Sequence, residues 1–216
     1  MSCAVVPVKL LEAAKSRLLP HLTQPQRELL SLAMLRDVLT TLRHVPFLER
    51  VVVLTPDETV AETARDVGAE VLLRDDSGLN PAINAAARDL GLGGHEPFLV
   101  VLGDVPGIEE EDVETLFDSV AGEGGPSVAL AASSDGGSAA LLRTPHTAIA
   151  ARFGADSARA HREAAHEAGI AYRELELPSL SLDLDRVADL DRFLQSRLRA
   201  SHTRQLLESL PLGETT

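Results

Sequence analysis

Lysine is nearly absent from this chain of 216 residues: of its 20 lysine and arginine side chains, only Lys9 and Lys15 are lysines. Cysteine is equally scarce, and the single residue Cys3 excludes an internal disulfide and a metal cage built from cysteines. Tryptophan is missing, and no apolar run approaches the roughly 18 residues of a membrane span. The opening residues MSCAVV lack the basic stretch of a signal peptide, so we expect a cytoplasmic protein with no membrane partner.

Positive charge is also scarce overall, because the formal net charge is −13. No block of basic residues offers a surface for a nucleic-acid backbone, so we expect no nucleic-acid partner. An acidic surface repels polyanions. A ligand that carries phosphates would therefore need a local group of positive side chains, or metal ions.

Short apolar runs alternate with helical patterns along the chain. We expect strands at 4–8, 50–55, 70–73, 98–102, 127–132, 139–143 and 171–177. We expect helices at 59–67, 81–90, 109–120, 157–168 and 189–198, after a first helix that begins at a capping box formed by Thr23 and Gln26. The alternation predicts a single-domain α/β fold with a mostly parallel central sheet sandwiched by helices. Residues 1–198 would form the domain and 199–216 a C-terminal helical tail.

The first helix has one apolar stripe in this interpretation. Its members recur at helical spacing and are Leu29, Leu32, Leu35, Leu39 and Leu42. They should face the core.

The loop after the first strand carries the scarce positive charges, namely Lys9, Lys15 and Arg17, together with Ser16. Ligands of parallel α/β sheets bind beyond the carboxyl ends of the strands, and this loop lies there. Lysine suits phosphate as a compact charge, and arginine grips phosphate oxygens in pairs. The alternative is that both lysines are solvated surface groups. The chain has no G-x-x-x-x-G-K-[ST] and no dinucleotide fingerprint, which disfavours a P-loop ATPase or a Rossmann dehydrogenase.

Aspartates follow two apolar segments. Asp104, in VVLGDVPGI, comes directly after the strand expected at 98–102, and Asp183 and Asp185, in SLSLDLD, should point the same way from a strand-like run. Mg²⁺ usually takes one or two protein carboxylates and completes its shell with phosphate and water. The alternatives are that Asp104 caps a turn and that one aspartate of the pair caps the next helix.

Three shorter segments could hold other parts of a ligand. Asn80, in GLNPAINAA, could cap a helix or read a base, and the glycine-rich turn in SSDGGSAALL could bind an anion through its N–H groups. Gly154 and Ser157, in RFGADSARAH, lie at a helix N-terminus, another anion site. Each segment is equally explained by simple turn or cap chemistry. We expect most histidines to be surface groups, and His161 and His166 lie on different helix faces and so do not form a metal pair.

These motifs together resemble one family. VVPVK with AAKSRL, then GLN, GDVP, the Gly-Gly-Ser turn, RFGADS and DLD occur in the order found in the guanylyltransferases of coenzyme F-420 biosynthesis. The resemblance covers about residues 4–195. It implies a nucleotidyltransferase of the glycosyltransferase-A type that uses GTP and Mg²⁺. Such an enzyme transfers GMP to the phosphate of phosphoenolpyruvate or 2-phospho-L-lactate and releases pyrophosphate.

The resemblance also implies roles for residues of this chain. Those that would bind the nucleotide are Lys9, Lys15, Ser16, Arg17 and Asn80, and those that would act in catalysis are Lys15, Arg17 and Asp104. The metal ligands would be Asp104, Asp183 and Asp185. The small phospho-acid would be held by Ser138, Gly154 and Ser157.

The chain departs from the family pattern at one turn. It reads Ser133-Ser134-Asp135 where members commonly carry an Asp-Arg pair, whereas Ala139 matches members that use phosphoenolpyruvate. The alternatives are a nucleotidyltransferase of the same fold with another base or acceptor, or a catalytically weakened homologue that only binds.

Overall fold

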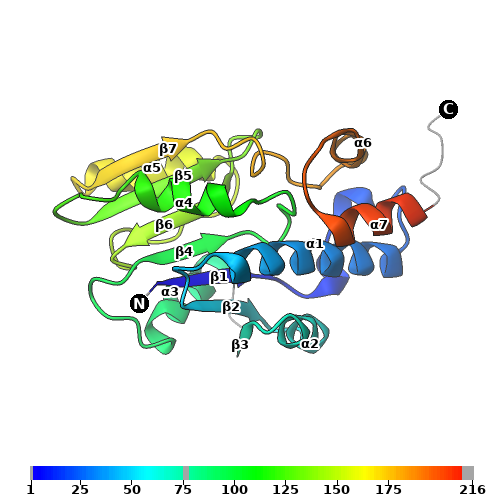
Figure 1. Ribbon diagram of the computed structural model, residues 1–216, viewed down its shortest axis with the longest axis horizontal. Coiled ribbons are helices and arrows are strands. Elements are labelled where there is room, and N and C mark those ends of the chain that lie inside the picture. The colour runs from blue at the N-terminus through cyan, green and yellow to red at the C-terminus, as the bar shows by residue number, and fades with distance from the viewer. Residues whose placement is uncertain (1, 75–77, 211–216) are drawn as a thin grey trace.

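A seven-stranded sheet forms the centre of the computed structural model, which describes residues 2–74 and 78–210 (Figure 1). Its strands are β1 Cys3–Pro7, β2 Arg50–Thr55, β3 Glu70–Leu73, β4 Phe98–Val101, β5 Ser127–Ala132, β6 Ser138–Thr144 and β7 Ala171–Leu175. They lie in the order β3-β2-β1-β4-β6-β5-β7, and every pair is parallel except those that β6 makes with β4 and β5. The predicted mostly parallel α/β fold is confirmed.

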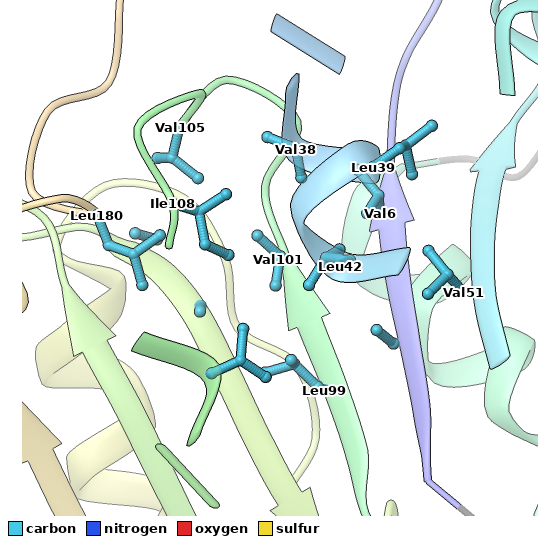
Figure 2. Packing of buried hydrophobic residues seen from close by; sticks show 14 of the residues in the cluster. Val6, Val38, Leu39, Leu42, Val51, Leu99, Val101, Val105, Ile108 and Leu180 are labelled. Atoms are coloured by element: carbon cyan, nitrogen blue, oxygen red, sulfur yellow. The ribbon is translucent and has the colours of Figure 1, made fainter. Parts of the chain in front are cut away.

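Helices cover both faces of the sheet. Apolar side chains from α1 (Gln24–His44), α2 (Glu58–Asp66) and α4 (Glu110–Asp118) pack on one face, and those from α3 (Leu79–Asp89) and α5 (Ser157–Glu167) pack on the other. Figure 2 shows side chains of α1 packed toward Val6 of β1 and Val101 of β4. Burial on both faces explains why the central strands are continuous apolar runs.

Helix α1 begins as predicted, but its buried face is wider than the predicted stripe. The capping box is confirmed, because Gln26 N donates to Thr23 Oγ1 and Thr23 N donates to Gln26 Oε1. The expectation that Leu29 faces the core is wrong, since this side chain is 52% exposed. Leu30 and Met34 are buried instead, because α1 also packs against the C-terminal helices.

The C-terminal helices α6 (Val187–Gln195) and α7 (Ser201–Ser209) extend the core beyond the end of the sheet. Leu207 of α7 belongs to the same buried cluster as Leu30 and Met34 of α1. Both carboxylate oxygens of Asp37 cap α7, accepting from the backbone N–H groups of residues 202 and 203 at 3.0 and 2.8 Å. The predicted tail therefore packs on the domain as far as residue 210, and its last six residues lie outside the described range.

The segment before α6 corrects one expectation. Residues 181–185 form no strand, and Leu184 N makes a single backbone hydrogen bond, of 3.4 Å, to Asp104 O. Leu184 is buried in the cluster with α1, so the alternation of leucine and aspartate reflects an extended segment that crosses the edge of the sheet. None of the helices within 2–74 and 78–210 is long and apolar enough to cross a membrane.

Candidate active site

The loop between β1 and α1 places a lysine in an unusual backbone conformation. The loop contains two short 3-10 helices, η1 (Leu11–Ala13) and η2 (Ser16–Leu18), and Lys15 lies between them with φ +50° and ψ 40°. This left-handed region costs a residue with a side chain about 1–2 kcal/mol. Interactions of the Lys15 side chain must therefore offset the cost.

Those interactions are two short ion pairs. Lys15 Nζ donates to Asp104 Oδ2 at 3.0 Å and to Asp185 Oδ1 at 2.7 Å, and the lysine side chain is only 6% exposed. Arg17 Nη1 donates to Asp185 Oδ2 at 3.0 Å from a largely exposed position. Four of the predicted site residues thus meet beyond the carboxyl ends of β1 and β4. The alternative interpretation of Lys15 as a solvated surface group is wrong.

Lys15 and Asp185 stabilise the charged form of each other. Burial by itself lowers the pKa of Lys15, but the negative charges of Asp104 and Asp185 outweigh it and raise the pKa. Burial raises the pKa of Asp185, and the charge and hydrogen bond of Lys15, then the charge of Arg17, outweigh it and lower the pKa. Among the described hydrogen bonds, the carboxylate of Asp104 accepts only from Lys15, and that of Asp185 accepts from Lys15 and Arg17, so neither carboxylate caps a turn or helix. At the start of α6, Asp189 Oδ2 accepts from the backbone N–H of Arg186 instead.

Asp183 and one oxygen of Asp104 lack such compensation. Burial and, after it, the negative charges of Asp104, Asp185 and Asp135 together raise the pKa of Asp183 to about 6. Oδ1 of Asp104 is buried and receives no hydrogen bond from any described residue. Oxygen donors with excess negative charge fit a hard divalent cation such as Mg²⁺. No group of three or more His, Cys, Asp or Glu side chains within the described ranges could hold a metal alone, so a metal here would need substrate oxygens or water as further ligands.

A cleft runs along the carboxyl ends of β1, β2 and β4. It consists of two adjoining cavities of about 290 Å³ each, and the residues that both share include Lys9 and Leu79. The first cavity is also lined by Lys15, Asp104, Asp185, Ser31 and Met34, and the second by Leu54, Thr55, Pro56, Arg74, Gly78 and Ala82. Lys9 is exposed and makes no ion pair with another described residue. It is therefore accessible at the junction of the two cavities.

A glycine allows the two loops of the cleft to approach each other. A Cβ atom at Gly103 would lie 3.3 Å from Cγ2 of Val8, closer than an ordinary van der Waals contact. The residues that follow these two positions are Asp104 and Lys9. The close packing against Val8 therefore explains why the GDVP motif has a glycine at position 103.

Asn80 is engaged with a backbone segment beside the cleft. Its Nδ2 donates to Phe153 O at 2.9 Å, and its Oδ1 accepts from Phe153 N at 2.7 Å. The interpretation of Asn80 as a helix cap is wrong, because the N-cap of α3 is Gly78. Contact of Asn80 with the nucleotide stays a prediction, and its neighbour Leu79 lines both cavities.

The residues predicted to hold the small acid gather at the N-terminus of α5. Ser157 Oγ lies 3.0 Å from Ser138 Oγ, both residues are buried, and Gly154 has φ +138°, a conformation that favours glycine. The expectation of a surface histidine is wrong for His161, which is fully buried with Nδ1 3.0 Å from Ser138 Oγ. Nothing in a single sequence distinguishes this histidine from the exposed His166.

The glycine-rich turn lies close to the carboxylates. Asp135 Oδ1 accepts from Ser133 Oγ at 2.6 Å and from Gly137 N at 3.0 Å, and Ala158 N donates to Gly136 O at 3.2 Å. The Ser133 hydrogen bond has the largest effect on the pKa of Asp135, which is lowered. The charge of Asp135 also raises the pKa of Asp183. The turn therefore contacts α5 through Gly136 and acts electrostatically on Asp183 through Asp135.

Sequence reasoning missed one residue that supports the loop. Arg27, in the first turn of α1, is only 4% exposed, and its Nη1 donates to Ala14 O at 2.7 Å. It therefore holds the peptide directly before Lys15. Arginine is usually exposed, so sequence pattern alone could not indicate this contact.

Comparison with known proteins identifies the family. The family model described as "Guanylyl transferase CofC like" matches residues 2–213. The chain belongs to this family. The predicted resemblance is confirmed, and the protein is a nucleotidyltransferase.

Several relatives carry specific names. Phosphoenolpyruvate guanylyltransferase of Rubrobacter xylanophilus is 41% identical over 189 residues, which are 88% of this chain and 91% of that protein. The enzyme of the same name from Sphaerobacter thermophilus is 36% identical over 188 residues, covering 87% and 90%. The 3-phospho-D-glycerate guanylyltransferase of Colwellia psychrerythraea is 33% identical over 187 residues, covering 87% and 88%.

Solved structures show the same fold at low sequence identity. A Desulfovibrio desulfuricans protein described as a candidate nucleotide-diphospho-sugar transferase has a TM-score of 0.77 at 19% identity, with 96% of this chain and 95% of that chain covered. A cytidylyltransferase from Leptospira borgpetersenii has a TM-score of 0.63 at 15% identity, with 96% and 93% covered. The predicted nucleotidyltransferase fold is thereby confirmed.

Proposed function

We propose that this guanylyltransferase transfers GMP from GTP to the phosphate of a three-carbon phospho-acid, in the cytoplasm and as a step of coenzyme F-420 biosynthesis. Phosphoenolpyruvate is the favoured acceptor and 2-phospho-L-lactate the next. The observation that carries the proposal is the fixed position of Lys15 between Asp104 and Asp185, in a cleft also lined by Lys9. An acidic chain thus keeps both of its lysines where a triphosphate would need them.

The reaction forms and breaks one bond at the same phosphorus. An oxygen of the acceptor phosphate attacks the α-phosphorus of GTP, and the bond from that phosphorus to the bridging oxygen of the β-phosphate breaks, so that pyrophosphate leaves. The acceptor oxygen is already ionised at neutral pH, and no general base is required. The protein therefore has to position two anions and neutralise their repulsion.

The chain supplies cations that are suited to this task. Lys15 is held by two carboxylates, so its charge needs no reorganisation when a phosphate arrives. Lys9 and Arg17 are exposed, and Ser16 at the start of η2 adds a hydroxyl donor beside them. Together they would hold the three phosphates of GTP.

We infer that Asp104 and Asp183 hold Mg²⁺. The unpaired Oδ1 of Asp104 and the raised pKa of Asp183 support this assignment, because Asp104 keeps one buried oxygen that no donor of the described residues reaches, and Asp183 forms no ion pair with a described residue. When bound, Mg²⁺ would neutralise charge on the phosphates. Both oxygens of Asp185 accept hydrogen bonds, from Lys15 and Arg17, so its part in metal binding stays a prediction.

The remaining space is divided between nucleoside and acceptor. The second cavity, which continues from Lys9 toward the end of β2, would take the nucleoside. Ser138, Gly154 and Ser157 at the N-terminus of α5 would hold the carboxylate and phosphate of the acceptor. Relatives named for phosphoenolpyruvate and for 3-phospho-D-glycerate support a three-carbon acid as the acceptor class.

Pyrophosphate release tests the proposal. GTP and Mg²⁺ are offered with phosphoenolpyruvate, 2-phospho-L-lactate, 3-phosphoglycerate or a sugar phosphate in parallel reactions, and ATP, CTP and UTP replace GTP in matched controls. We expect release with GTP and phosphoenolpyruvate. Release with the sugar phosphate alone, or with another nucleotide alone, would contradict the proposal. No pyrophosphate release with any combination of nucleotide and acceptor, in protein that still binds GTP, would indicate a homologue that only binds.

A further inference from the structure

A fully buried histidine lies directly behind the proposed acceptor site. His161, on α5, has its Nδ1 3.0 Å from Ser138 Oγ, and its Nε2 accepts a hydrogen bond of 2.8 Å from the backbone N–H of Arg152. The ring of Phe153 meets the imidazole edge to face, with 5.1 Å between the centroids. Both ring nitrogens therefore have hydrogen-bond partners, and the ring packs against Phe153.

These contacts fix the tautomer of the ring. Burial and, after it, the positive charge of Arg143 lower the pKa of His161 to about 4, so the ring is neutral at physiological pH. A backbone N–H can only donate, so Nε2 carries the lone pair and Nδ1 carries the proton. His161 therefore donates to Ser138 and cannot remove its proton, which excludes a serine nucleophile activated by this histidine.

Counting hydroxyl protons shows what the network offers to a ligand. Ser138 and Ser157 have one hydroxyl proton each, and one of the two protons lies in the 3.0 Å hydrogen bond between their oxygens. Because His161 also donates to this pair, the second hydroxyl proton has no acceptor among the described hydrogen bonds. The pair is thus left with one O–H group that can donate to an external oxygen.

The backbone beside the two hydroxyls is held from two sides. His161 holds Arg152 N, and Asn80 of α3 holds both the N–H and the carbonyl of Phe153. Gly154 follows directly with its positive φ. The peptide that would face an acceptor is therefore ordered before any ligand arrives.

We propose that His161 is a positioning residue that orients the Ser138–Ser157 hydroxyl pair as a hydrogen-bond donor toward an oxyanion of the acceptor. The inference rests on the proposed function, because it assumes that the acceptor binds at the N-terminus of α5. The hydroxyl pair would bind a carboxylate or phosphate oxygen of the acceptor. His161 would therefore affect the affinity and alignment of the acceptor, and not the binding of GTP.

Three substitutions of His161 separate its two hydrogen bonds. His161→Asn places an amide nitrogen near the position of Nδ1 and can keep the donor to Ser138. His161→Gln places an amide oxygen near Nε2 and can keep the acceptor for Arg152 N, and His161→Phe keeps the ring but neither bond. His166→Asn, at an exposed position on the same helix, is the matched control.

Steady-state kinetics measures two values for each variant, KM for the acceptor and KM for GTP, and the two are compared with those of the parent. We expect KM for the acceptor to rise about 10- to 100-fold in His161→Phe and His161→Gln, as for the loss of a hydrogen bond to a charged group, with KM for GTP unchanged. His161→Asn should stay within a few-fold of the parent, and so should the control. Equal increases in both KM values, or an unchanged KM for the acceptor in His161→Phe, would overturn the inference. If His161→Phe fails to fold, the inference is tested by His161→Asn and His161→Gln, because only the Gln variant should raise KM for the acceptor. Equal KM values for the acceptor in these two variants would overturn it.

Nitrogen-15 NMR of the imidazole gives a readout that does not depend on turnover. We expect a neutral ring with the proton on Nδ1 from pH 6 to 8, and an Nε2–H tautomer or an imidazolium in that range would overturn the inference. The two proposals can fail separately. Wild-type protein that uses no three-carbon acid refutes the proposed function, whereas use of the acceptor with an unchanged KM in His161→Phe refutes only the role of His161.

Discussion

Lys15 and Asp185 lie 170 positions apart in the sequence, and Nζ of the lysine is 2.7 Å from Oδ1 of the aspartate. This ion pair joins the loop after β1 to the segment before α6. Lys15 also binds Asp104, which follows β4, so one ammonium group connects three separate parts of the chain. The loop that would bind phosphates and the carboxylates that would bind metal are therefore ordered together.

Replacing Lys15 should impair GTP use more than it impairs folding. In Lys15→Met we expect kcat/KM for GTP to fall about 100-fold or more, because a fixed charge near the phosphates is lost. Lys15→Arg should recover only part of the activity, since a planar fork does not replace a compact ammonium between two carboxylates. Steady-state kinetics with Arg65→Met as an exposed control would check this. A near-parental kcat/KM in Lys15→Met would exclude Lys15 from the site.

Asp183 should reduce the stability of the metal-free protein at neutral pH. The pKa of this group is about 6 in the folded protein against an ordinary value of 3.8, so between these values the folded state binds more protons than the unfolded state. The protonated form of Asp183 therefore favours the folded state. This contribution to the free energy of unfolding is complete below about pH 4 and is lost as the pH rises through 6. Asp183→Asn should therefore raise Tm at pH 7.5, in the absence of Mg²⁺, and change Tm little at pH 4.

The same substitution should remove the response to metal. We expect Mg²⁺ to raise Tm of the parent at pH 7.5 and to lose this effect below about pH 5, as Asp183 becomes protonated. In Asp183→Asn the shift should be absent and turnover should be lost. Asp118→Asn, at an exposed position on α4, is the control. A lower Tm in metal-free Asp183→Asn, or an equal Mg²⁺ shift in both proteins, would count against the assignment.

Arg27 should act on GTP through the loop that it holds. Arg27→Met removes the bond to Ala14 O, and we expect KM for GTP to rise about tenfold as the peptide before Lys15 loses its support. The buried carbonyl left without a donor should also cost about 1–3 kcal/mol of the free energy of unfolding. The control is Arg36→Met, on the same helix, where an exposed ion pair with Asp66 contributes little. A lower Tm with unchanged KM for GTP would assign Arg27 to stability alone.

Sequence reasoning succeeded where a residue's environment follows from its nearest neighbours. β-Branched runs such as RVVVLT predicted the central strands, and Asp104 was placed at the ligand edge because it follows a buried strand. It failed where a distant element decides burial. Leu29 is exposed and Met34 buried because α7, at the other end of the chain, packs on α1.

Polar side chains of the site show the same limit. The hydrogen bonds of His161 join α5 to β6 and to residue 152, and a single sequence contains no periodic signal for such contacts. Arg27 is buried because Ala14, thirteen positions earlier, returns to its side of α1. Burial of these groups is a property of the assembled tertiary structure, and only the structure reveals it.

The last helix should depend on one carboxylate of α1. Asp37 is 5% exposed and caps α7 through both oxygens, so Asp37→Ala should cost about 1–2 kcal/mol, a decrease in Tm of about 2–8 °C. Asp37→Asn, which keeps one acceptor oxygen, should lose less. Hydrogen exchange locates the effect, because the amides of His202 and Thr203 should lose protection while those of β1 and β4 keep theirs. Unchanged protection at His202 and Thr203 in Asp37→Ala would mean that apolar packing of Leu207 alone holds α7 on the domain.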